Sequence, residues 1–108
     1  MKIHKSKKWK GGWFIGNFKP AAHSTEEFEV CYKFHPKGER WPKHYHKVAT
    51  EVNYLIRGRM KLMKKIFVRG DVFILEPGEV ADPVFLADCE LIVVKIPSVK
   101  NDKYEIYD

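Results

Sequence analysis

The sequence predicts a single all-β domain with the strand spacing of a sandwich or a barrel. Apolar and polar residues alternate with a period of two in several segments, which is typical of half-buried strands. Strand-breaking residues, among them the pairs Gly11-Gly12, Gly70-Asp71 and Pro77-Gly78, occur along the chain at roughly the 8–12-residue spacing of such folds. No segment carries a long 3.6-residue apolar pattern, and 108 residues suffice for one domain.

The first strand is expected at residues 13–18, after the Gly11-Gly12 break. In the second, at residues 28–34, Phe28, Val30, Tyr32 and Phe34 share one face, and we expect Tyr32 and Phe34 in the core. A tight Lys64-Lys65 connection predicts a hairpin between strands at 59–63 and 66–68. The remaining strands are expected at residues 52–56, 72–75, 84–86 and 90–96.

The net charge of +6 is concentrated at the amino terminus. Residues 1–10 contain five lysines and no acidic residue, so the rest of the chain is nearly neutral. We therefore expect a basic, mobile tail at residues 1–12, a barrel at 13–97 and a carboxy-terminal extension at 98–108. A salt-sensitive contact of the tail with nucleic acid or acidic lipid is the alternative to a solvated tail, and we do not expect nucleic acid as the main partner.

Composition excludes several classes of protein. A hydrophobic content of 44% is too high for a disordered chain, and no apolar run is long enough to cross a bilayer. The first residues lack an apolar signal core, so we expect a cytoplasmic protein without a membrane partner. Cys31 and Cys89 form no CxxC pair and lie in strand-like segments, which favours buried, reduced thiols.

Two histidines and one glutamate carry the clearest chemical signal. In an extended strand, residues i and i+2 point to the same face, so His44 and His46 should project together, about 7 Å apart along the chain. Glu51 begins the next strand and can bring its carboxylate to the same place. Two imidazoles and one carboxylate with open positions are a donor set for a divalent transition metal, and we expect Fe, Mn, Zn or Ni.

The spacing of this region resembles the first conserved motif of the cupin family, and a later segment resembles the start of the second. The matching residues are Gly38, His44, His46, Glu51 and Gly58 in the first motif, and Gly70, Asp71, Pro77 and Gly78 in the second. The resemblance covers residues 28–96. It implies a small, single-domain jelly-roll barrel, the double-stranded β-helix, with a pocket lined by inward-facing strand positions.

The second motif departs from the family pattern at one position. A histidine usually stands three residues after the motif's glycine, where this chain has Ala81, which cannot bind a metal. Asp82 follows and precedes Pro83, and a bulge at this point would turn Asp82 into the pocket. Asp82 is therefore a candidate catalytic acid beside Glu51.

Other polar and sulfur-containing residues receive simpler interpretations. Asn53 shares the face of Glu51 and is expected to orient a metal ligand. Tyr45 should face away from the pocket, and His35 should lie in a loop. Surface positions are expected for His4 and His23, and core positions for Met60 and Met63.

These residues support three functional hypotheses. The first is a metal-dependent enzyme acting on a small polar molecule. The cupin resemblance favours a sugar or sugar-derivative isomerase or lyase, and an Fe(II) dioxygenase is an alternative within this class. The second is a non-catalytic module that binds a small molecule, and the third is an accessory protein that uses its lysine tail. The resemblance also implies a homodimer, for which Trp13, Phe14 and Ile15 of the first strand are candidate contacts.

Overall fold

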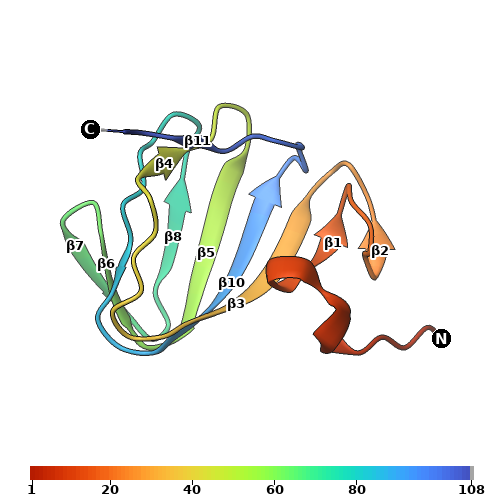
Figure 1. Ribbon diagram of the computed structural model, residues 1–108, viewed down its shortest axis with the longest axis horizontal. Helices are drawn as coiled ribbons and strands as arrows, with labels where there is room; N and C mark the ends of the chain where they lie inside the picture. Colours follow the sequence, from red (N-terminus) through yellow and green to blue (C-terminus); the bar gives the residue numbers. More distant parts are fainter. Residues whose placement is uncertain (108) are drawn as a thin grey trace.

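The computed structural model describes residues 1–107, which form three β-sheets (Figure 1). The largest has the strand order β2-β1-β3-β10-β5-β8, and smaller sheets have the orders β7-β6-β9 and β11-β4. Every pair of neighbouring strands is antiparallel except the parallel pair β1 and β2. The strands are β1 (Trp13–Gly16), β2 (His23–Ser24), β3 (Glu29–His35), β4 (His44–Tyr45), β5 (Thr50–Arg57), β6 (Arg59–Leu62), β7 (Lys65–Val68), β8 (Val72–Leu75), β9 (Val84–Phe85), β10 (Cys89–Ile96) and β11 (Tyr104–Glu105).

The strands expected from the alternating pattern are present, with ends that differ by one or two residues. The turn between β6 and β7 lies one residue earlier than expected, at Met63 and Lys64, both of which have positive φ. Met63 is therefore exposed in a tight turn, and its expected place in the core is wrong, whereas Met60 is buried. The two-residue strands β2, β4 and β11 are too short to produce a recognisable period.

The core lies between the large sheet and the small sheet of β6, β7 and β9. It contains Leu55, Phe85, Leu91 and both cysteines, and neither cysteine is exposed. The cysteines are free thiols, as the sequence predicted. Burial raises the pKa of Cys31 to about 12 because the thiolate would lose its hydration.

The expected orientation of β3 is wrong. Cys31 and His35 point into the molecule, whereas Tyr32 and Phe34 lie on the outer face with 41% and 48% of their surface exposed. The alternation is present, but the aromatic side is the outer one. The outer face continues across the sheet in register, where Tyr32 is followed by Ile92, Tyr54 and Val72 on β10, β5 and β8.

This outer face bears on the expected dimer contact. Trp13, Phe14 and Ile15 of β1 are half-buried within the chain, and Trp13 lines an internal cavity. They are therefore less available for a partner than the apolar outer face, which exposes Tyr54 and Ile74 by 48% and 52%.

The two ends of the chain are attached to the domain in different ways. The amino-terminal residues include two short 3-10 helices, η1 (Ser6–Lys8) and η2 (Lys10–Gly12), and η2 lies against β3. The carboxy-terminal strand β11 pairs with β4, which carries the first histidine of the candidate site. No helix within residues 1–107 is long and apolar enough to cross a membrane.

Candidate functional site

The two histidines of the HxH segment point into one cavity, as their spacing predicted. His44 and His46 are 9% and 6% exposed, and their ring centroids are 5.5 Å apart. His44 Nδ1 donates to the carbonyl of Pro42 at 2.9 Å, and His46 Nδ1 donates to the carbonyl of Asp102. Because a carbonyl only accepts, these bonds place the proton on Nδ1 and leave each Nε2 lone pair for a ligand.

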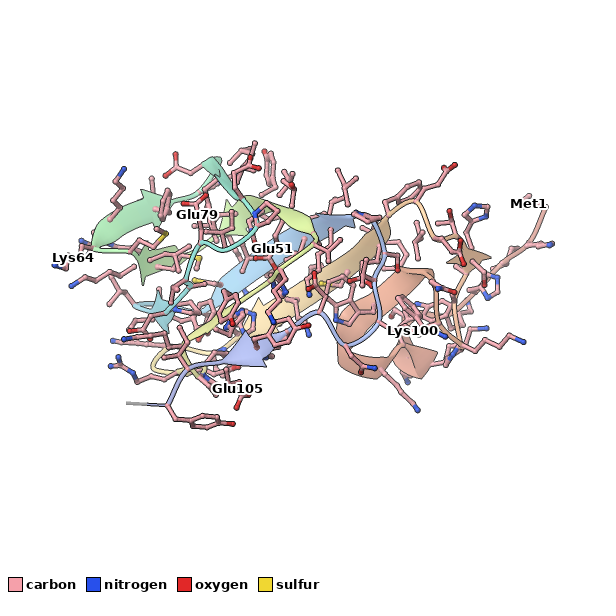
Figure 2. All side chains as sticks on the ribbon, turned by 90° about the horizontal axis from the view of Figure 1, so that it is seen from above. Met1, Glu51, Lys64, Glu79, Lys100 and Glu105 are labelled. Atoms are coloured by element: carbon pink, nitrogen blue, oxygen red, sulfur yellow. The ribbon has the colours of Figure 1, made fainter. Side chains whose placement is uncertain are left out.

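Glu51 and Asn53 project into the same cavity from β5, and Figure 2 shows Glu51 in the middle of the molecule. Glu51 Oε1 lies 3.9 Å from His46 Nε2. Asn53 is 6% exposed. Neither His46 Nε2 nor Asn53 Nδ2 has a hydrogen-bond partner, although both atoms are buried. Such unpartnered atoms are costly, and a bound ligand would relieve the cost.

Burial also sets the charge of His44. Its pKa is lowered from the usual value, mainly by burial and further by the nearby Lys103 and His46, against the opposing bond to the Pro42 carbonyl. The imidazole is therefore neutral at pH 7. A neutral ring is the form that can donate a lone pair to a metal ion or accept a proton.

Asp102, in the carboxy-terminal extension, fixes the segment that follows the histidines. Its carboxylate accepts the backbone N–H groups of Lys47, Val48 and Ala49 at 2.9 to 3.3 Å. Its own carbonyl accepts the proton of His46. Burial acts to raise the pKa of Asp102, but these hydrogen bonds outweigh it and leave the pKa below its usual value. The extension thus orients His46, which the sequence did not indicate.

The predicted inward turn of Asp82 is not found. Ala81 is buried, lines the cavity and bridges to His44, while Asp82 is exposed and lies outside the cavity lining. The backbone hydrogen bonds between Ala81 and His44 maintain the alternation of side chains along this segment. Because Ala81 points into the cavity, the side chain of Asp82 points to solvent. The proline that follows introduces no inward bulge.

His35 belongs to the cavity, and its expected place in a loop is wrong. It ends β3, is 7% exposed and stacks on Phe85 with a centroid distance of 4.1 Å. Its Nδ1 lies 3.0 Å from Glu39 Oε1, which also accepts the indole N–H of Trp41. Burial acts to raise the pKa of Glu39, but these two hydrogen bonds leave it below the usual value.

The cavity has a volume of about 180 Å³ and combines apolar walls with these polar groups. Met60, Leu91 and Val93 contribute to the walls. Lys33, Lys95 and Lys103 are the basic residues of the lining. Partial burial, together with the nearby Lys95 and Lys33, lowers the pKa of Lys103, against the opposing effect of Glu105.

The donor atoms of the site are of the types that bind metal ions, but the distance between the Glu51 carboxylate and His46 is longer than in a metal site. Two imidazole Nε2 atoms and one carboxylate are ligands for divalent transition metals. However, no three His, Cys, Asp or Glu side chains among the described residues are arranged to hold an ion. Tetrahedral zinc ligands lie about 3.3 Å apart, so Glu51 must move closer to His46 by roughly half an ångström to share an ion with it.

Solved structures with known folds match the chain closely in shape. An RmlC-like cupin from Methanocaldococcus jannaschii with a double-stranded β-helix fold has a TM-score of 0.60 and 26% identity, over 68% of this chain and 73% of that one. The polyketide cyclase RemF from Streptomyces resistomycificus has a TM-score of 0.74 and 16% identity, over 100% and 87%. A sugar phosphate isomerase of the cupin superfamily from Silicibacter pomeroyi has a TM-score of 0.57 and 20% identity, over 65% of this chain and 50% of that one.

These likenesses define the class of protein. The chain has the double-stranded β-helix fold of the solved cupin structures, as the spacing of its motifs implied. Structural neighbours with this fold include enzymes. No protein-family model matches the chain, and no curated protein sequence does.

Proposed function

We propose that this cupin is a metal-dependent enzyme that acts on a small polar molecule in the cavity, with His44, His46 and Glu51 as the metal ligands. The observation that carries the proposal is the buried Nε2 of His46, which has no partner and faces the Glu51 carboxylate. Both histidines have Nδ1 bound to a backbone carbonyl, which is the usual arrangement of a metal-binding imidazole.

The proposed reaction class is isomerisation or elimination on a sugar or sugar derivative. A divalent ion would polarise a carbonyl or hydroxyl group of the substrate. Among the chain's own residues, Asn53 is placed to donate a hydrogen bond to the substrate, because its Nδ2 is buried and free. His35 is a further candidate for moving a proton, since it lines the cavity beside Glu39. Asp82 has no part in this proposal, because it lies outside the cavity lining.

A second candidate function is the binding of a small molecule without turnover. Two observations favour it. The donors are not gathered into a three-ligand group among residues 1–107, and Ala81 stands where the second cupin motif usually supplies a histidine. In this case His44, His46 and Glu51 would contact the ligand directly. An iron dioxygenase is the remaining alternative, and the identity of the bound metal decides it.

Turnover by metal-loaded protein tests the proposal. Chain loaded with manganese or zinc is incubated with ribose 5-phosphate and fructose 6-phosphate, and products are followed by proton NMR. We expect turnover that stops on adding a chelator and in His46→Gln, but continues in the control His23→Gln, which changes an exposed histidine. Ligand binding without turnover in every metal form would favour the second function.

A further inference from the structure

The cavity has an excess of positive charge that the metal ligands do not explain. Its lining includes three lysines, on β3, on β10 and just before β11, but Glu51 is the sole carboxylate among the described lining residues. The lining therefore carries more positive than negative charge. Lysine side chains are seldom buried, but Lys33 and Lys95 are half-buried here, and Lys103 is exposed at the edge of the same cavity.

The three ammonium groups are held over two tryptophan rings. Lys33 Nζ lies 5.7 Å from the ring centroid of Trp13 and 5.5 Å from that of Trp41. Lys95 Nζ lies 4.9 Å from the Trp13 centroid, and Lys103 Nζ lies 4.4 Å from the Trp41 centroid. Both tryptophans line the cavity. Because the lysines share rings, their charges lie around one opening instead of spreading over the surface.

Carboxylates of the protein neutralise this charge only in part. Lys95 Nζ lies 3.9 Å from Glu29 Oε1. Within residues 1–107, Lys33 and Lys103 make no ion pair with a carboxylate, and their contacts are with the indole rings. Grouped ammonium charges repel one another, and a bound oxyanion would remove that repulsion.

The polar atom deeper in the cavity points to the same kind of occupant. Asn53 is buried, and its Nδ2 donor has no acceptor. A ligand with an oxygen at this position would satisfy the donor. The apolar walls contributed by Met60, Leu91 and Val93 fit a short carbon skeleton between the two polar ends.

We propose that the cavity binds a small organic anion, with its carboxylate or phosphate group held by Lys33, Lys95 and Lys103 and an oxygen near Asn53. The inference rests on the proposed function, because it names the class of substrate for that site. The volume of about 180 Å³ is close to that of an engineered cavity of about 150 Å³ that holds benzene. The enclosed part of the ligand therefore has about six to ten non-hydrogen atoms, and any larger part extends into the opening.

Calorimetric titration of the full chain tests this inference. The probes are malonate for the carboxylate source, inorganic phosphate for the phosphate source, and malonamide as a neutral analogue of malonate. We expect one or both anions to bind and malonamide to bind at least tenfold more weakly. The anion that binds more tightly shows whether the anionic group of the ligand is a carboxylate or a phosphate. Failure of both anions to bind would overturn the inference.

Lysine variants show whether the binding is in this cavity. Lys33→Gln and Lys103→Gln should each weaken anion binding at least tenfold. Lys64→Gln is the matched control, since it removes the same charge from the exposed β6–β7 turn at the far end of the molecule (Figure 2). Thermal unfolding of each variant establishes that it is folded. Equal affinity in the three variants would contradict the inference.

Metal-free protein separates this inference from the proposed function. After chelator treatment, the lysine site should still bind the anion, and the two cavity variants should still weaken it. That result supports the anion site even if no metal ever binds. If the anion binds only to metal-loaded protein, and Lys33→Gln and Lys103→Gln bind it normally, the anion is a ligand of the metal. The lysine site would then be refuted while the proposed function stands.

Discussion

Replacement of Asp102 with asparagine should destabilise the protein at neutral pH and much less in acid. The carboxylate accepts three backbone N–H groups, from Lys47, Val48 and Ala49. The neutral amide offers one weaker acceptor and turns an NH₂ group toward these donors. The bond to Ala49 is buried, and the other two are partly buried.

The size of the effect follows from these bonds. A hydrogen bond to a charged group contributes about 1.5 to 3 kcal/mol when buried, and partial exposure reduces that figure. We therefore expect Asp102→Asn to lower the free energy of unfolding by about 3 kcal/mol at pH 7. For a domain of this size, that loss lowers Tm by roughly 15 °C.

The pH dependence has a definite sign. The folded-state pKa of Asp102 is below its unfolded value, so the carboxylate stabilises the fold above about pH 4 and loses this contribution as pH falls through the folded pKa. We expect the free energy of unfolding of Asp102→Asn to be lower than that of the wild type, and this deficit to shrink toward pH 3. Urea unfolding followed by tryptophan fluorescence at pH 7, 5 and 3 measures it. Asp82→Asn, at an exposed aspartate, is the control and should show no deficit. A deficit below about 0.5 kcal/mol at pH 7, or one that does not change with pH, would refute the reasoning.

Three further predictions use other parts of the fold. Both cysteines are fully buried, so a thiol reagent at pH 8 should react only after the protein is unfolded in urea, and rapid labelling of native protein would contradict the described core. Gly58→Ala should lower the free energy of unfolding by about 3 kcal/mol, because Gly58 has a φ of +108° and an added Cβ would lie 2.5 Å from the carbonyl oxygen of Asp88. Gly78→Ala should lower the free energy of unfolding by only about 1 kcal/mol, because Gly78 has a φ of +88° but open space around it. Equal losses in the two variants, measured by urea unfolding, would contradict this reasoning. If two copies pair through the apolar outer face, Tyr54→Lys with Ile74→Lys should yield a monomer by light scattering, whereas Phe14→Lys should not; the reverse pattern would indicate the first strand as the contact.

The sequence predicted the strands and the convergence of His44 and His46 because both depend on local periodicity. The period of two places alternate side chains on one face, whatever the tertiary structure. It does not say which face is buried. On β3, both sets of alternate residues have apolar members, so the pattern favours Tyr32 and Phe34 for the core, although Cys31 and His35 occupy it.

The parts of the site that the sequence missed depend on long-range pairing. Asp102 reaches the segment after the histidines across more than fifty residues, and no local pattern records that contact. His35 enters the cavity because β3 pairs with β10 in a register that only the fold defines. The error at Asp82 has a different origin, since Pro83 suggested a bulge that the pairing of Ala81 with His44 does not permit.

Metal content is the measurement that tests the central proposal most directly. Tag-free protein is incubated in turn with iron(II), manganese, zinc and nickel, dialysed, and analysed by plasma mass spectrometry beside His44→Ala and the exposed-histidine control His23→Ala. We predict close to one ion per chain for at least one metal in the wild type and in His23→Ala, and loss of that ion in His44→Ala. A wild type that retains none of the four metals, or a His44→Ala variant that retains the ion fully, would contradict the assignment of these residues as metal ligands.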